Sequence, residues 1–209
     1  ASHELRSPLT RIRMGLELLG DQASPALREE MTRNIAELDE LIEEILLASR
    51  LDAPQADVGT VESIDLTGLA SEECAATQVA LDLGDDPQSL AVPGVPRLMR
   101  RMLRNLIDNA RRHGSQEDIQ VSLRAENEQW VSLSVSDRGP GVPEPLRDRI
   151  FEPFYRIPGS VDGGAGLGLA LVRAIAQRHR GQVRYEERAG GGSSFVVTLP
   201  REISPTMPT

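Results

Sequence analysis

Four groups of residues in this sequence combine types and spacings that suit chemistry, and the first lies at its beginning. Ser2–Thr10 reads Ser-His-Glu-Leu-Arg-Ser-Pro-Leu-Thr and places an imidazole, His3, beside a carboxylate, Glu4. Imidazole gains and loses a proton near neutral pH. Pro8, inside a helix, removes a backbone donor and crowds the carbonyl of Glu4. We therefore predict a bent helix beside a reactive base; the alternative is a solvated histidine without function.

The second group lies in a helix predicted from Pro96 to about His113. Asn105 and Asn109 are four residues apart, so their amides share one helix face. Asparagine is a poor helix former, and its carbonyl oxygen suits Mg²⁺ that phosphates already hold. Arg112 and His113 follow and can reach phosphate oxygens. The alternative is a surface helix whose two asparagines have no role.

The third group, Asp137-Arg138-Gly139-Pro140-Gly141, follows an apolar strand predicted at Trp130–Val135. A carboxylate at this position can accept a hydrogen bond from an exocyclic amine such as that of adenine. Gly139 and Gly141 permit a close backbone approach and turn angles closed to other residues. The alternative is an ordinary turn at a strand end.

The fourth group is Gly163–Leu169, Gly-Gly-Ala-Gly-Leu-Gly-Leu, which leads into a helix predicted at Leu167–Arg178. Backbone amides at a helix start form an anion site. The spacing fits neither the dinucleotide pattern, because Leu171 is the sixth residue counted from Gly166, nor a P-loop, because no lysine follows. The group therefore predicts phosphate binding by a different fold.

The stretch Phe151–Arg156, Phe-Glu-Pro-Phe-Tyr-Arg, lies between the two glycine groups and holds half of the chain's six aromatic residues. It can anchor a lid whose mobile part is Gly159–Gly164. A local hydrophobic cluster is the alternative.

The amino-acid composition excludes several classes of function and structure. The 209 residues carry a formal charge of −9, which argues against a nucleic-acid surface. All 23 basic residues are arginines, so phosphate contacts must come from arginine, histidine or backbone amides. The single cysteine, Cys74, excludes an internal disulfide. No apolar run reaches the length of a membrane span. Because the chain starts without Met and apparently inside a helix, we expect a fragment whose membrane attachment, if any, lies upstream.

Apolar periodicity predicts two helices at the start of the chain. The first seam repeats in steps of three and four at Leu5, Leu9, Ile12, Leu16 and Leu19, and the second at Leu27, Met31, Ile35, Leu38, Ile42 and Ile45. We predict that residues 1–51 form an antiparallel hairpin that pairs with a second copy into a four-helix bundle. Packing on the rest of the same chain is the alternative.

Residues 52–62 lack periodicity and are predicted to be a linker. In the second domain, residues 63–200, we expect a helix over 66–77 capped by Asp65, and short strands at 79–83 and 89–92 on either side of a turn. Further strands are expected at 119–125, 130–135, 182–187 and 194–199, and a short helix at 146–150. Residues 201–209 are expected to be a disordered tail.

The order of the motifs, His-Glu-x-x-Ser-Pro, Asn-x-x-x-Asn-Ala, Asp-x-Gly-x-Gly, Phe-x-Pro-Phe and Gly-x-Gly-Leu-Gly-Leu, resembles that of the sensor histidine kinases of two-component systems. The resemblance covers about Ser2 to Pro200. It implies an α+β fold: a helical hairpin that dimerises, followed by an α/β-sandwich ATP-binding domain of the kind shared with gyrase-type ATPases.

The resemblance also implies roles for single residues. His3 is the expected phosphoacceptor, Glu4 its acid/base neighbour, and Ser7 the position that directs water in dephosphorylation of the partner, where relatives usually have Thr or Asn. Asn109 is the expected Mg²⁺ ligand and Asn105 its neighbour on the phosphate side. The remaining ATP contacts are expected from Asp137, Gly139, Gly141, Phe154, Gly164, Gly166, Leu167, Gly168 and Leu169, with assistance from Arg112 or His113.

The expected activity is autophosphorylation of His3 by ATP and Mg²⁺, followed by transfer to an aspartate of a response-regulator receiver domain. The expected location is the cytoplasmic part of an inner-membrane sensor. Two rival interpretations are a nucleotide-binding dimeric scaffold without activity, and another ATPase or serine kinase on the same nucleotide fold.

Overall fold

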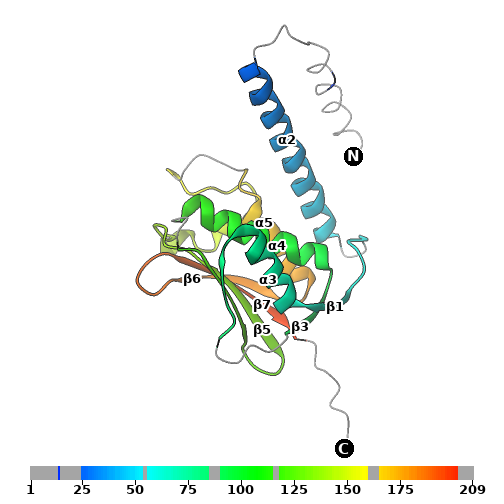
Figure 1. Ribbon diagram of the computed structural model, residues 1–209, viewed down its shortest axis with the longest axis vertical. Helices are drawn as coiled ribbons and strands as arrows, with labels where there is room; N and C mark the ends of the chain where they lie inside the picture. Colours follow the sequence, from blue (N-terminus) through cyan, green and yellow to red (C-terminus); the bar gives the residue numbers. More distant parts are fainter. Residues whose placement is uncertain are drawn as a thin grey trace, which may run out of the picture. The chain divides into compact units, whose positions relative to one another are not determined.

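The computed structural model describes residues 14, 25–53, 56–84, 90–114, 118–159 and 165–201. The chain forms two compact units, Ala1–Ala53 and Pro54–Thr209 (Figure 1). Within the residues described, every helix is too short or too polar to traverse a lipid bilayer.

The described part of the first unit is essentially one helix, α2, Pro25–Asp52, which begins at a proline as helices often do. Its predicted seam separates into two adjacent lines. Ile35 is buried, with Met31 and Ile42 packed against it, whereas Leu27, Leu38 and Ile45 remain 47%, 48% and 41% exposed. The first helix of the predicted hairpin lies outside the described residues.

The second unit is built on a five-stranded sheet in the order β2-β4-β5-β7-β6. The strands are β2 Ala80–Asp82, β4 Gln120–Ala125, β5 Trp130–Ser136, β7 Ser193–Pro200 and β6 Gln182–Glu187. β2 runs parallel to β4, and the other pairs are antiparallel. A separate two-stranded sheet pairs β1, Glu62–Asp65, with β3, Ala91–Gly94.

Three helices cover one face of the larger sheet: α3 Leu66–Thr77, α4 Pro96–His113 and α5 Gly168–Arg178 (Figure 1). Along β5, buried residues alternate strictly with half-buried ones and supply that face. Val131, Leu133 and Val135 of β5 are at most 1% exposed and pair with Leu199, Val197 and Phe195 of β7. The intervening Ser132, Ser134 and Ser136 point away from these apolar residues and are only half-buried. The core therefore lies between this apolar sheet face and the helices.

Most predicted elements are confirmed, including both ends of α4 and the N-cap of α3, where Oδ1 of Asp65 accepts from N of Thr67 at 3.1 Å. The strands predicted at 79–83 and 89–92 belong to different sheets, since β2 joins β4 and β3 joins β1. Two predictions need correction. A strand, β1, begins at Glu62 inside the expected linker. The short helix expected at 146–150 is two 3₁₀ turns, Glu144–Leu146 and Arg149–Phe151.

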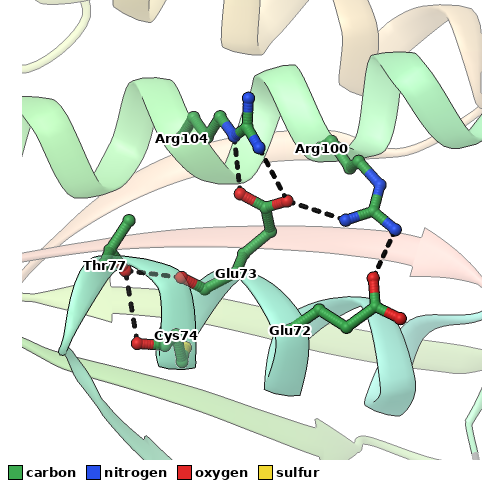
Figure 2. Close-up of polar contacts among 6 residues, drawn as sticks. All are labelled: Glu72, Glu73, Cys74, Thr77, Arg100 and Arg104. Atoms are coloured by element: carbon green, nitrogen blue, oxygen red, sulfur yellow. Dashed lines mark hydrogen bonds and ion pairs between the residues drawn. The ribbon is translucent and has the colours of Figure 1, made fainter.

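Helix α3 holds the outer side of α4 through a buried carboxylate (Figure 2). Glu73 is 2% exposed and accepts from Arg104 through both oxygens, at 2.5 and 3.0 Å, and from Arg100 at 2.8 Å. Arg100 also donates to Glu72 at 2.5 Å. Because bidentate guanidinium–carboxylate pairs are directional, this network fixes the rotation of α4 about its axis.

Candidate functional site

The asparagines predicted to act together lie on the inner side of α4. Asn105 is 9% exposed, and its Nδ2 donates to the carbonyl oxygen of Gly168 at 3.3 Å. Gly168 is the first residue of α5, where backbone N–H groups are free of intrahelical partners. Asn109 is half-buried and lies one turn further along α4. The structure therefore brings the asparagine motif next to the glycine-rich helix start.

Asp137 follows the end of β5 and is 1% exposed. Its Oδ1 accepts from N of Gly139 at 2.7 Å. Its Oδ2 is buried and has no hydrogen-bond partner among the described residues. Burial raises the pKa of this carboxyl, while the backbone N–H groups of Gly139 and Ser193 act in the opposite direction. A buried acceptor without a partner is costly unless a ligand supplies a donor.

The end of α4 lies directly against this strand end. A Cβ on Gly139 would be 2.3 Å from the carbonyl oxygen of His113, so only glycine permits the approach. His113 is half-buried, and its pKa is lowered by burial and by nearby Arg112 and Arg156, with Asp137 opposing them. The asparagine and Asp-x-Gly-x-Gly motifs therefore meet at one corner of the unit.

Phe154 and Gly166, twelve residues apart, are joined by a backbone hydrogen bond of 3.0 Å from N of Phe154 to O of Gly166. Gly166 has φ +75°, and a Cβ there would be 2.8 Å from the carbonyl oxygen of Tyr155. Phe154 itself has φ +62° and a ring that is 62% exposed. The aromatic stretch thus anchors the residues that lead into α5, whereas residues 160–164 of the predicted lid lie outside the described residues.

The other predicted residues are placed as follows. Leu167 is buried at the N-cap of α5 and Leu169 is half-buried in its first turn. Gly141 lies near the hydroxyl of Tyr185, which accepts from N of Val142 at 3.0 Å, and Arg112 is exposed at the end of α4. Four predicted residues lie outside the described residues: His3, Glu4, Ser7 and Gly164.

Sequence reasoning missed one neighbour of Asp137, the start of β7. N of Asp137 donates to O of Ser193 at 2.9 Å, and Ser193 is 7% exposed. The run Gly190-Gly191-Gly192 before an apolar strand was the available signal. Ser193 contacts Asp137 through a backbone carbonyl, and residue type alone does not predict such a contact.

These residues have the donors and acceptors that an adenine nucleotide needs. The unpaired Oδ2 of Asp137 suits an exocyclic amine, and the start of α5 suits phosphate oxygens. In the described parts of the chain, no three His, Cys, Asp or Glu side chains are grouped to hold a metal ion. A Mg²⁺ ion here would accordingly depend on phosphate oxygens together with the side-chain carbonyl of Asn109.

Comparison with known families gives two matches. Residues 94–203 match the model of histidine kinase-, DNA gyrase B- and HSP90-like ATPases, and residues 1–54 match the His Kinase A phosphoacceptor domain. The first match contains α4, Asp137 and the start of α5, and the second contains His3.

Individual relatives agree with these matches. The chain is 37% identical to the sensor protein RstB of Escherichia coli K12 over 95% of its own length and 47% of that protein. It thus spans about half the length of such curated relatives. Among solved structures, the Acinetobacter baumannii histidine kinase AdeS has a TM-score of 0.68 at 26% identity, covering 95% of this chain and 97% of that one. ShkA, solved in complex with AMPPNP, has a TM-score of 0.71 at 25% identity, covering 97% of this chain and 45% of that one.

Proposed function

The chain belongs to the family of histidine kinase-, DNA gyrase B- and HSP90-like ATPases and carries a His Kinase A phosphoacceptor domain, and from this premise we propose that it is an ATP-dependent protein-histidine kinase. The observation that supports the nucleotide assignment is the buried, unpaired Oδ2 of Asp137. In the proposed complex, this oxygen accepts a hydrogen bond from the exocyclic amine of adenine. The AMPPNP complex of ShkA supports a nucleotide at the same fold.

In the proposed reaction, a ring nitrogen of His3 attacks the γ-phosphorus of ATP. The bond from this phosphorus to the β–γ bridging oxygen breaks, and ADP leaves with the electron pair. Glu4 accepts the proton of the imidazole. A phosphoryl transfer of this kind requires mainly that the reactants are positioned and that their charge is compensated. The second unit therefore positions ATP and forms no covalent bond with it.

Each predicted residue of the nucleotide site then has a positioning role. Asp137 selects the base, and Gly139 and Gly141 shape its pocket. Asn105 and the backbone of Gly164, Gly166, Leu167, Gly168 and Leu169 hold the phosphate end, with Arg112 or His113 offsetting charge. Asn109 would hold Mg²⁺, which neutralises charge on the phosphates when bound.

We also propose that the first unit forms a homodimer. Leu27, Leu38 and Ile45 are separated by 11 and 7 residues, close to whole numbers of helical turns, so they form one exposed apolar line along α2. This line extends over roughly 27 Å at the usual rise per residue. Leu38→Glu should convert a dimer into a monomer in sedimentation experiments, whereas Arg33→Glu, a change at an exposed polar position, should leave the dimer intact.

The phosphoryl group is proposed to pass from His3 to an aspartate of a response-regulator receiver domain. Ser7 is proposed to direct water when that partner is dephosphorylated. We also propose that the chain works in the cytoplasm as part of a membrane-attached sensor. Timed transfer to a panel of purified receiver domains would identify the partner.

The kinase assignment is tested with γ-labelled ATP and Mg²⁺. The wild type should acquire phosphate that is labile in acid and stable in base, and His3→Gln should acquire none while binding ATP with wild-type affinity. Label that persists in His3→Gln, or that is stable in acid, would refute the assignment in favour of another acceptor or a serine kinase. Full nucleotide binding and dimerisation without any label in the wild type would indicate the inactive scaffold.

A further inference from the structure

Three charged residues beside Asp137 have no role in the chemistry above. Nε of Arg138 donates to Oδ2 of Asp118 at 3.1 Å, and Nη2 of Arg188 donates to Oδ1 of the same carboxylate at 3.0 Å. Arg188 also donates from Nη1 to the carbonyl oxygen of Asp118 at 2.8 Å. One carboxylate thus joins two arginines, one next to Asp137 in sequence and one at the end of β6.

Arg138 has a second set of contacts, to the turn that connects β6 to β7. Its Nη1 donates to the carbonyl oxygens of Ala189 at 2.7 Å and Gly191 at 2.9 Å. This turn contains three consecutive glycines with φ of +82°, +97° and +109°, residues 190 to 192. Such a run has little conformational preference of its own, so hydrogen bonds must restrain it. The guanidinium adds its two to the backbone bonds from N of Arg188 to O of Gly192 at 3.2 Å and from N of Gly191 to O of Arg188 at 2.9 Å.

The restrained turn lies directly on the base-recognition residue. A Cβ on Gly192 would be 2.0 Å from the carbonyl oxygen of Asp137, and N of Asp137 donates to O of the next residue, Ser193, at 2.9 Å. A shift of the turn would therefore displace the backbone that carries the unpaired carboxylate oxygen.

The side chains of Asp118 and Arg138 are 50% and 36% exposed. Ion pairs with this exposure contribute little to the stability of a fold. The contacts of Arg138 with the turn between β6 and β7 offer a better explanation for this arrangement.

We propose that Arg138 is a positioning residue for base selection, which, with Asp118 and Arg188, holds the turn at residues 189–193 against Asp137 and so fixes the carboxylate that selects a base with an exocyclic amine. The inference rests on the proposed function, because the ligand of Asp137 is taken to be adenine.

The test compares ATP with purine riboside triphosphate, which lacks the exocyclic amine, by equilibrium binding. In Arg138→Gln, affinity for ATP should fall about tenfold and affinity for the analogue less than about twofold, since only ATP uses the carboxylate. Arg138→Lys should restore only part of the discrimination, because an ammonium group lacks the planar fork. The matched control is Arg184→Gln, a similarly exposed arginine of β6 paired with Glu126 and Glu186, which should change neither affinity.

A second measurement requires no nucleotide. Hydrogen exchange of the Asp137 amide, which donates to Ser193, should accelerate about tenfold in Arg138→Gln and also, to a smaller extent, in Asp118→Asn. Equal losses of affinity for both ligands, or unchanged exchange in both variants, would overturn the proposal. If the wild type itself failed to distinguish the two ligands, the adenine assignment would fall, and the exchange rates would still decide whether Arg138 holds the turn.

Discussion

Two carboxylates in the second unit are almost equally inaccessible to solvent, but their pKa values are shifted in opposite directions. Glu73 is 2% exposed and Asp137 is 1% exposed. The pKa of Glu73 is lowered, above all by its hydrogen bond from Arg104, which outweighs burial. The pKa of Asp137 is raised by burial, since only backbone N–H groups and more distant charges oppose it. The two residues, almost equally inaccessible to solvent, therefore differ in their hydrogen-bond partners.

This difference separates a structural carboxylate from a binding one. Both oxygens of Glu73 accept hydrogen bonds from arginines within the protein, so neither oxygen is left without a partner. Asp137 retains one acceptor that the fold does not satisfy. A buried ionisable group with an unsatisfied atom is a better indicator of a functional site than burial or charge alone.

The largest effect is expected from Asp137→Asn. Because Oδ1 accepts from N of Gly139, an asparagine would turn its carbonyl oxygen to that N–H and its NH₂ group to the position of Oδ2. The adenine amine would then face a donor. We expect affinity for ATP to fall about 30- to 150-fold, the loss of a hydrogen bond to a charged group, as measured by calorimetry. If the Asp137→Asn variant bound ATP with wild-type affinity, Asp137 would not be a ligand-binding carboxylate.

The next effect is on stability and comes from Glu73→Gln. Removing the charge takes the carboxylate partner from Arg104 and leaves Arg100 paired with Glu72 alone, but the two arginine side chains are 55% and 39% exposed and can be hydrated. We therefore expect a loss of about 1–2 kcal/mol in the free energy of unfolding, less than for a fully buried pair. Urea denaturation measures it. ATP affinity should stay within about twofold of the wild type, because both oxygens of Glu73 are already paired with arginines within the protein.

Its matched control is Glu72→Gln, which removes the exposed partner of Arg100 on the same helix turn. The carboxylate of Glu72 is 65% exposed, so the free energy of unfolding should change by less than about 0.5 kcal/mol. Equal losses in the two variants would show that burial of Glu73 has no energetic consequence.

The sequence predicted one of these carboxylates and not the other. Asp137 stands at the end of an apolar strand and before two glycines, a local pattern with a chemical meaning. Glu73 is one of two adjacent glutamates in a helix without basic residues, and its partners are 27 and 31 residues away. Only the packing of α3 on α4 distinguishes Glu73 from its exposed neighbour.

The same limit applies to the fold. Pro96 at the start and Gly114 after the end made α4 predictable from local signals. Strand β1, Glu-Ser-Ile-Asp, has a single apolar residue, Ile64, and forms because β3 offers it a partner. Likewise, Ser193 reaches Asp137 through its backbone, and such contacts depend on pairing between distant strands rather than on residue type.

A smaller effect is the pH dependence of the contribution of Glu73. Its pKa is lowered in the folded state, so its stabilisation is present above the ordinary value of 4.5 and is lost as pH falls through the lowered value. The difference in unfolding free energy between wild type and Glu73→Gln should therefore shrink toward zero in acid. Urea denaturation at several pH values checks this, and a difference that grows in acid would contradict it.

The smallest effect has the opposite sign and concerns the nucleotide-free protein. The pKa of Asp137 is raised in the folded state, so its protonated form favours folding below the ordinary value of 3.8, and this advantage is lost as pH rises through the raised value. At pH values above the raised pKa, the ionised carboxylate destabilises the fold, so Asp137→Asn should there be as stable as the wild type or more stable, by less than about 1 kcal/mol. Urea denaturation without nucleotide should show this gain disappearing in acid, while saturating ATP should reverse the order because only the wild type gains binding energy. A clear loss of stability in the nucleotide-free variant would mean that Asp137 supports the fold as Glu73 does.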